Sequence, residues 1–154
     1  MKIGGVVEQS SLALYVFCNV PDEPGIAGEI LSLFSKAGIN LEYITETMDT
    51  QGKSIISFCV HQSIVSQVDN VLKNTQLQYF DLKISKIENV QMFGVYGPHF
   101  REKPAIASRF CCALGSIGVN ILNLSSSIST IAAIIREEDG EKAKNAVLKL
   151  FELP

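Results

Sequence analysis

Pro24-Gly25-Ile26-Ala27 and Gly38-Ile39-Asn40-Leu41 recur eighty residues later as Pro104-Ala105-Ile106-Ala107 and Gly118-Val119-Asn120-Ile121. No gap is needed between the two blocks in either copy. Self-similarity at a fixed spacing is the signature of a repeated structural unit, so both copies must obey the same interpretation. The sequence therefore predicts two similar modules, an arrangement that favours binding at a shared interface over a catalytic centre.

The composition is that of a globular chain, with 154 residues, of which 47% are hydrophobic and 19% charged. Modules of roughly 75 residues bury only about 60% of their unfolded surface, so we expect the copies to pack on each other or on a second chain. The net charge of −3 argues against a nucleic-acid partner, which would require a basic face. There is no apolar run of membrane-spanning length and no signal peptide, which indicates a cytoplasmic protein without a membrane partner.

The first copy alternates β-rich and helical patterns. We expect strands over residues 12–20, 39–47 and 54–60, and a fourth strand in which Phe80, Leu82 and Ile84 alternate with polar residues. One helix is predicted to open at Pro24, with capping oxygens from Asp22 and Glu23, and to end at Gly38. A second helix is predicted from Ile64 to Leu72. The order strand, helix, strand, strand, helix, strand is ferredoxin-like, with an antiparallel sheet and both helices on one face.

The second copy lacks one element. We expect strands over residues 90–96, 119–126 and 131–136, and helices over 104–117 and 139–151, after which the chain stops. Because natural folds usually cover an unpaired strand edge, residues 3–7 are predicted to supply the missing edge strand. The fold class is therefore α+β, with two ferredoxin-like βαββαβ modules at residues 11–88 and at 89–154 plus 2–8.

The repeated corner, where a strand passes through a turn into a helix, carries the candidate chemistry. The first helical N–H groups lack internal partners and, with the helix dipole, suit a carboxylate. Gly25 would let a ligand approach the backbone, and Asp22 could accept a hydrogen bond from an ammonium group. Two such anchors suit a free α-amino acid. A structural role stays open, in which Asp22 only caps the helix, Gly25 only allows tight packing, and Asn40 and Asn120 satisfy local backbone groups.

The stretch Val20-Pro21-Asp22-Glu23-Pro24-Gly25-Ile26-Ala27, followed by Phe34, Gly38-Ile39-Asn40-Leu41 and Ile44, resembles an ACT domain. The tandem resembles the regulatory C-terminal region of aspartokinases over essentially the whole chain. The resemblance implies modules that bind an amino acid of the lysine or threonine class, regulate an enzyme of amino-acid metabolism, and assemble as a homodimer. By position, the resemblance implies ligand contacts at Asp22, Gly25, Ile26 and Ala27. Asn120 and Ile121 in the second copy of the partner chain would close this site. Asn40 would take the place of Asn120 in the reciprocal interface.

Two departures from the family pattern affect the expected ligand. Glu46 stands where the family usually has Gln, and it would attract an ammonium group and repel a carboxylate, by roughly 4 kcal/mol at about 4 Å and an effective dielectric near 20. The second copy has Arg101-Glu102-Lys103 before Pro104-Ala105, and Ser127 is followed by Ile128 where the family has Glu. We therefore expect the second corner to bind more weakly or to be structural.

Three function hypotheses follow. The leading one is a free-standing regulatory protein that senses an amino acid through Asp22, Gly25, Ile26, Ala27, Asn40, Glu46, Asn120 and Ile121. Because no phosphate-binding glycine loop is present, it is not expected to be an enzyme, and it needs no cofactor. The second is a structural or protein-interaction module without a small ligand. The third is an enzyme that uses Cys111 or Cys112 with His99. Because the cysteines form no CxxC pair, we expect no bound metal. We expect Cys18 and Cys59 to be buried, reduced thiols within strands.

Overall fold

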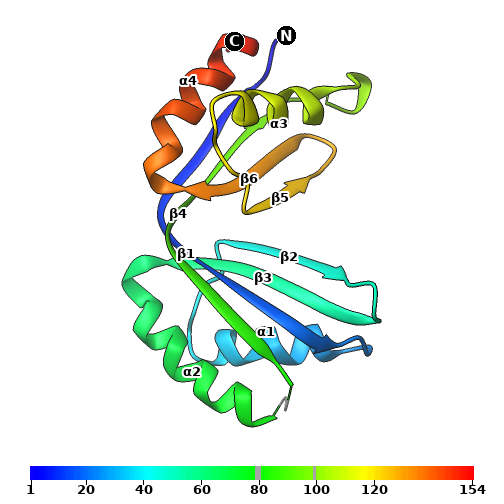
Figure 1. The fold of residues 1–154 in the computed structure, drawn as a ribbon, viewed down its shortest axis with the longest axis vertical. Coiled ribbons are helices and arrows are strands. Elements are labelled where there is room, and N and C mark those ends of the chain that lie inside the picture. Colours follow the sequence, from blue (N-terminus) through cyan, green and yellow to red (C-terminus); the bar gives the residue numbers. More distant parts are fainter. Residues whose placement is uncertain (79–80, 99) are drawn as a thin grey trace. The chain divides into compact units, whose positions relative to one another are not determined.

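The computed structural model describes residues 1–78, 81–98 and 100–154. The chain divides into two compact units, shown in Figure 1. We call Leu12–Glu88 the first module, and Met1–Ser11 together with Asn89–Pro154 the second module. Both modules combine a β-sheet with two helices on one of its faces (Figure 1). The predicted fold class, α+β with two ferredoxin-like modules, is confirmed.

The first module follows the predicted order of elements. Its sheet has the strand order β2-β3-β1-β4, and β3 pairs antiparallel with both β1 and β2. A short 3-10 helix at Gln62–Ile64 leads into the second helix. The elements are β1 (Gly5–Pro21, of which residues 12–21 belong here), α1 (Ile26–Lys36), β2 (Tyr43–Met48), β3 (Lys53–His61), α2 (Val65–Gln78) and β4 (Lys83–Tyr96, of which residues 83–88 belong here).

The second module is completed by the N-terminal residues, as predicted. Its strand order is β1-β4-β6-β5, and the N–H of Gly4, just before β1, donates to the Tyr96 carbonyl of β4 at 2.6 Å. Short 3-10 helices at Phe100–Glu102 and Glu137–Asp139 precede its two α-helices. The further elements are α3 (Ile106–Ser116), β5 (Asn123–Ser126), β6 (Thr130–Arg136) and α4 (Gly140–Leu150).

Each module has its own core between sheet and helices. In the first module, Phe58 on β3 stacks on Tyr15 of β1 with ring centroids 5.3 Å apart, and packs against Phe34 of α1 at 4.8 Å. In the second module, Phe93 of β4 stacks on Phe110 of α3 at 6.0 Å. All five rings are at most 1% exposed, and together with the aliphatic core residues they fill the layer between sheet and helices.

The two long strands differ from the prediction. Residues 3–7 and 12–20 were expected to form separate strands, as were 80–85 and 90–96; the structure has one continuous β1 and one continuous β4 instead. Phe80 lies outside the described residues. The polar stretches around Ser11 and Asn89 look like linkers in the sequence, yet both residues stay within a strand with a left-handed backbone, φ 59° and 53°. The Ser11 N–H is satisfied by Glu137 Oε1 at 3.1 Å.

The helix starts also differ. Pro24 and Pro104 were expected as first helical residues, but α1 begins at Ile26 and α3 at Ile106. The preceding residues, Gly25 (φ 94°) and Ala105 (φ 76°), are left-handed and therefore cannot belong to the helix. Neither helix has a side-chain N-cap, so the expected capping by Asp22 and Glu23 is wrong.

The predicted helix ends at Gly38 and Gly118 are correct, and both are Schellman motifs. The Ile39 N–H donates to Phe34 O at 2.9 Å, and the Val119 N–H donates to Leu114 O at 3.0 Å. These bonds occupy residues that the sequence assigned to the following strands, so β2 and β5 begin four residues later than predicted, at Tyr43 and Asn123. Within the described ranges, no helix is long and apolar enough to cross a membrane.

Candidate functional site

The first-module corner lies between the end of β1 and the start of α1. Gly25 has a left-handed backbone, and a Cβ added there would meet no atom within 4 Å, so the space above this residue is open. Asp22 is exposed, and its Oδ1 accepts a 3.4 Å hydrogen bond from the hydroxyl of Ser54 at the start of β3. Ile26 and Ala27 begin the helix and pack, half-buried, against the core.

The edge strand β2 adjoins this corner. Met48 pairs with Ser54, the hydrogen-bond partner of Asp22, and Glu46 pairs with Ile56 two residues further along β3. Because directly opposed residues share a face of a sheet, Glu46 projects from the same face as the buried Ile56, which is the face covered by the helices. The structure therefore brings Asp22, Gly25 and Glu46 to one end of the first module.

The remaining predicted residues are more distant in the chain. Asn40 is exposed, and its Nδ2 donates to Glu42 Oε1 at 3.3 Å, which favours the local role that was left open for it. Asn120 is exposed and Ile121 is half-buried against the core of the second module. Both lie between α3 and β5.

The corner of the second module contains a formed pocket of about 330 Å³. The loop before α3 and the first turn of that helix form one wall, and the β5–β6 hairpin forms the other. The hairpin turn is held by Ser127, whose Oγ accepts from the Thr130 N–H at 3.2 Å. The lining residues are Phe100, Arg101, Lys103, Ala105, Ile106, Ala107, Ser126, Ser127, Ile128 and Ile131.

The eighty-residue repeat relates this pocket to the predicted site. Ala105, Ile106 and Ala107 correspond to Gly25, Ile26 and Ala27, which share the left-handed residue followed by a helix start. Ser126 pairs with Ile131 as Glu46 pairs with Ile56. The repeat therefore extends to the residues that line this pocket.

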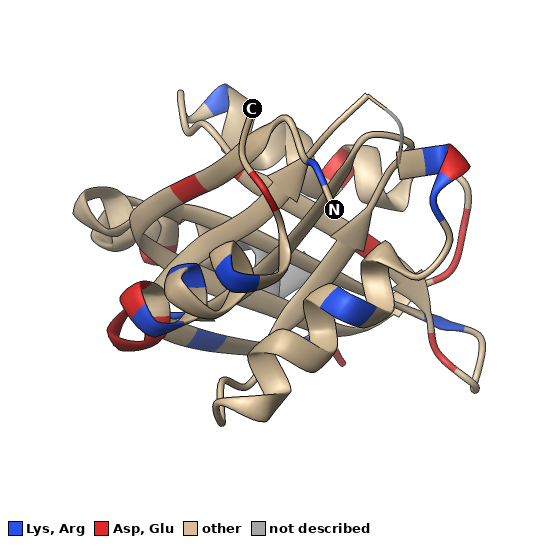
Figure 2. Ribbon diagram, turned by 90° about the horizontal axis from the view of Figure 1, so that it is seen from above, with Lys and Arg blue, Asp and Glu red and all other residues tan. Residues whose placement is uncertain are grey.

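The two corners differ in the charged residues that they carry; Figure 2 colours all Lys, Arg, Asp and Glu positions along the ribbon. Around the first corner, Asp22, Glu23 and Glu46 are exposed carboxylates. The second corner has Arg101 and Lys103 in its lining, with Ser126 in the position of Glu46. The first corner thus suits a ligand with a positive group, and the second suits a carboxylate.

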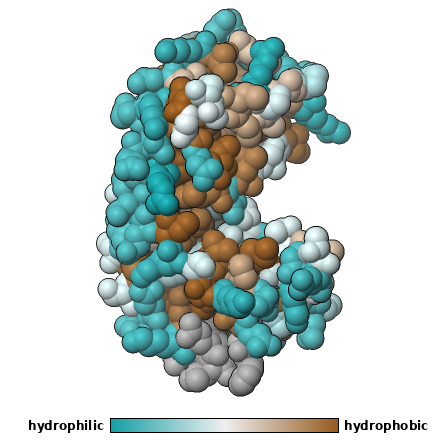
Figure 3. Space-filling view, in the orientation of Figure 1, coloured by the Kyte–Doolittle hydropathy of each residue, from teal (hydrophilic) through white to brown (hydrophobic). Residues whose placement is uncertain are grey.

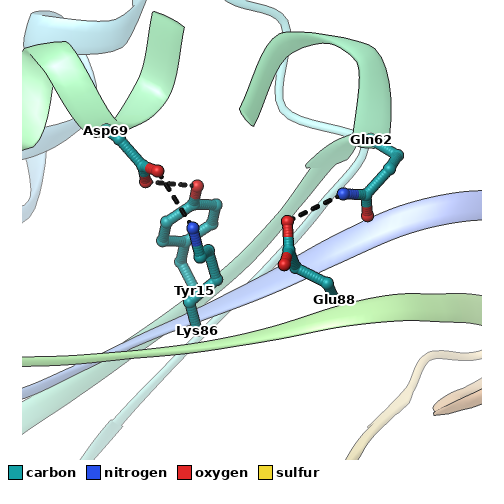
Figure 4. A network of polar contacts seen from close by, with 5 residues as sticks. All are labelled: Tyr15, Gln62, Asp69, Lys86 and Glu88. Atoms are coloured by element: carbon teal, nitrogen blue, oxygen red, sulfur yellow. Dashed lines mark hydrogen bonds and ion pairs between the residues drawn. The ribbon is translucent and has the colours of Figure 1, made fainter. Parts of the chain in front are cut away.

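A polar network supports the first module on the helix side of its sheet (Figure 4). The Tyr15 hydroxyl donates to Asp69 Oδ1 at 2.8 Å, and Lys86 Nζ bonds Asp69 Oδ2 at 2.9 Å. Burial alone would raise the pKa of Asp69, but the hydrogen bonds from Lys86 and Tyr15 hold it below its ordinary value. Burial, followed by the bond to Asp69, raises the pKa of Tyr15. This network fixes α2 to β1 and β4 and has no role at the corner.

The cysteines give little support to thiol chemistry. Burial and the neighbouring Cys112 raise the pKa of Cys111, the opposite of what a nucleophilic thiolate requires. His99, its proposed partner, lies outside the described residues. Cys59 is buried and Cys18 half-buried, and all four are free thiols. Among the described residues, no group of three or more His, Cys, Asp or Glu side chains could hold a metal ion.

The fold and the repeated corner define a tandem of ferredoxin-like modules, each with a strand-turn-helix corner. Family profiles for the ACT domain match residues 14–75 and 93–151. The chain belongs to the ACT domain family, and its 154 residues hold two ACT domains and no kinase catalytic domain.

Known proteins resemble this chain over its whole length. It is 26% identical over 151 residues to an aspartate kinase of Pseudomonas fluorescens, covering 98% of this chain and 37% of that protein. It is 28% identical over 158 residues to an aspartokinase of Mycobacterium tuberculosis, covering 97% and 36%. The chain thus spans little more than a third of the length of these relatives.

Solved structures share the fold. The ligand-free regulatory subunit of aspartate kinase from Thermus thermophilus superimposes with a TM-score of 0.85 at 21% identity, covering 97% of this chain and 98% of that one. Aspartate kinase from Synechocystis has a TM-score of 0.86 at 23% identity, covering 96% of this chain and 26% of that one.

Part of this pocket was not predicted from the sequence. Phe100 and the hairpin residues Ser126 and Ile131 were not named as candidates, although they line the second corner. The spacing of eighty residues was the available signal, since it carries Glu46 onto Ser126. In the first module Glu46 pairs with Ile56, and in the second module Ser126 pairs with Ile131. The connection between the paired residues is thus five residues shorter in the second module, so Ile131 does not lie eighty residues after Ile56 and its equivalence was hidden.

Proposed function

We propose that this chain is a regulatory module that binds a free amino acid at its repeated corners and thereby controls an enzyme of amino-acid metabolism. The observation that carries the proposal is the second-module pocket. Its lining from α3 and β5 corresponds residue by residue to Gly25, Ile26, Ala27 and Glu46 in the first module. A cavity of about 330 Å³ is at the lower end of the range of small-molecule sites.

The chemistry of the corner suits a zwitterion. The first N–H groups of α1 or α3, with the helix dipole, would receive the α-carboxylate. In the first module, the carboxylates of Asp22 and Glu46 would receive ammonium groups. Two carboxylates at one corner favour lysine, which has two ammonium groups, over threonine, which has one.

The assembly follows from the same proposal. The resemblance to aspartokinase regulatory regions supports a homodimer in which Asn120 and Ile121 of one copy close the first-module corner of the other. The similarity in fold to the regulatory subunit of aspartate kinase from Thermus thermophilus supports a kinase of that class as the partner enzyme. Ligand binding that favours one arrangement of the modules would then couple to the partner, with equal effect in both directions.

A second candidate, a protein-interaction module without a small ligand, is favoured by one observation. Strand β2 exposes Ile44 (46%) and Met48 (64%). At the equivalent positions of the repeat, Leu124 on β5 is 43% exposed and Ile128, in the turn after β5, is 67% exposed. Figure 3 shows apolar surface on both modules. Exposed apolar edges are typical of strands that associate.

Thermal unfolding with a panel of free amino acids separates the two candidates. A ligand present at 100 times its dissociation constant should add about 2.7 kcal/mol to the free energy of unfolding, and we expect lysine to raise the melting temperature most. Glu46→Gln should reduce this shift, whereas Glu138→Gln, the same charge change away from the corners, should leave it intact. If no amino acid stabilises the chain at millimolar concentration, the ligand proposal fails and the interaction module remains.

A further inference from the structure

A separate cavity of about 370 Å³ lies in the second module at the start of α4. Its walls come from β1, β4 and the 3-10 helix that leads into α4. None of its residues belongs to the repeated corners. It is lined by Glu8, Ser10, Gln91, Glu137, Gly140 and Glu141.

Gln91 is the unusual member of this group. It lies on β4, its side chain is in line with the core residues Phe93 and Val95, and it is only 6% exposed. In the part of the chain that the structure describes, its amide has no hydrogen-bond partner. No side-chain nitrogen or oxygen is both fully buried and unpaired there, so the amide must reach the open space of the cavity. An unpaired polar group in such a position costs free energy unless water or a ligand satisfies it.

Gly140 makes this position of Gln91 sterically feasible. A Cβ at residue 140 would collide with Gln91 Oε1 and would lie 2.8 Å from both Cδ and Nε2. Since any other residue would displace the amide, the glycine keeps a polar acceptor open at the base of the cavity.

The carboxylates around the amide are only partly used. Glu8 Oε2 is bonded to Lys144 Nζ at 3.0 Å, and Glu137 Oε1 accepts from the Ser11 N–H at 3.1 Å. The nearby Lys142 is paired with Asp139 at 2.7 Å. Because Lys144 neutralises Glu8, the remaining charge of the cavity lining is the two negative carboxylates of Glu137 and Glu141. Acidic residues near a helix N-terminus offset its dipole, but this explains neither Gln91 nor Glu8.

We propose that this pocket binds the ammonium groups of a small linear diamine. Each ammonium has three N–H donors, which match the oxygens left by Glu137, Glu141 and Gln91. The residues do not form a group suited to a metal ion among those the structure describes. A diamine fits this cavity better than a free amino acid, because no Lys or Arg is among the described residues that line it to receive an α-carboxylate.

The test uses 1,4-diaminobutane, which lacks the α-carboxylate that the helix start of the amino-acid corner would receive; the Gln91 amide reports binding at this cavity. We expect saturable one-to-one binding to the 154-residue chain by calorimetry, and a shift of the Gln91 side-chain amide in nitrogen–proton correlation spectra. Binding should weaken with added salt. Glu141→Gln should weaken it about tenfold, the value of one charge-assisted hydrogen bond, and Glu138→Gln, an exposed neighbour outside the lining, should not.

Gly140→Ala provides a second variant, because its Cβ displaces the Gln91 amide; it should also weaken binding. L-Lysine should bind this pocket more weakly than the diamine. No saturable binding, or equal losses in Glu141→Gln and Glu138→Gln, would show that the carboxylates only offset the helix dipole and would overturn the proposal. Neither result bears on amino-acid binding at the corners.

Discussion

Replacement of Ala105 by glycine should stabilise the protein. Ala105 has φ 76° immediately before α3, and the equivalent residue in the first module is Gly25 with φ 94°. A left-handed backbone brings the Cβ of an L-residue too close to the following carbonyl oxygen, which glycine avoids. Ala105 is exposed, so its methyl group contributes little to packing.

The magnitude follows from two opposing effects. The left-handed conformation costs an L-residue about 1–2 kcal/mol, whereas glycine loses about 0.4–1 kcal/mol more chain entropy on folding than alanine. Ala105→Gly should therefore raise the free energy of unfolding by about 0.5–1 kcal/mol. Ala107→Gly, two residues later and also exposed but inside α3, should lower it by about 1 kcal/mol.

Urea unfolding monitored by circular dichroism measures both variants against the wild type. The reasoning requires opposite signs for the same chemical change, which an effect on the unfolded chain alone cannot produce. If Ala105→Gly destabilises the protein as much as Ala107→Gly, the left-handed start of α3 is wrong, and with it the backbone geometry assigned to the second corner.

Three other predictions test the frame around the corners. Tyr15→Phe removes the 2.8 Å hydrogen bond to Asp69 and should lower the free energy of unfolding by about 1–2 kcal/mol at pH 7. Because the pKa of Asp69 is lowered in the folded state, the stability that this carboxylate contributes is present above its unfolded pKa, near 3.9, and is lost at lower pH. In urea unfolding, the difference between variant and wild type should therefore shrink below about pH 4, and a difference that does not change with pH would contradict the bond. Gly94→Ala would drive a Cβ into the Ile131 carbonyl and to 2.9 Å from Ala132 Cα, and should lower the free energy of unfolding by about 3 kcal/mol in thermal unfolding. The control Gly115→Ala, whose Cβ would meet nothing within 4 Å, should raise it by about 0.5–1 kcal/mol. Equal effects of the two variants would contradict the packing of β4 against β6. Burial raises the pKa of the Cys59 thiol to about 12, so a thiol reagent at pH 8 should label the exposed Cys112 and spare Cys59, and mass spectrometry that finds both labelled at one rate would refute the burial of β3.

The repeat made the fold readable from the sequence, because each copy constrained the other. The glycines at 38 and 118 end their helices as predicted, since the left-handed Schellman position selects glycine at both. The absent fourth strand of the second copy pointed correctly to the N-terminal residues. These predictions depend on local backbone chemistry and on the need to pair a sheet edge, both of which are written in short stretches of sequence.

Other features depend on contacts between distant residues. Asp22 looked like a helix cap, but its carboxylate bonds Ser54 on β3, a partner thirty-two residues away. Ala105 gave no sign of a left-handed backbone, because alanine ordinarily avoids it. Gln91 and Gly140 carry no signal in the sequence, since their contact exists only where the start of α4 meets β4.

The central claim is that the repeated corner binds an amino acid. The most direct measurement is a titration of the isotope-labelled chain with L-lysine and L-threonine, followed by backbone amide shifts. We predict saturable shifts confined to the helix starts and edge strands, at Gly25, Ile26, Ala27 and Glu46, and at the equivalent Ala105, Ile106, Ala107 and Ser126. Spectra that stay unchanged, or that shift only elsewhere, would contradict the account.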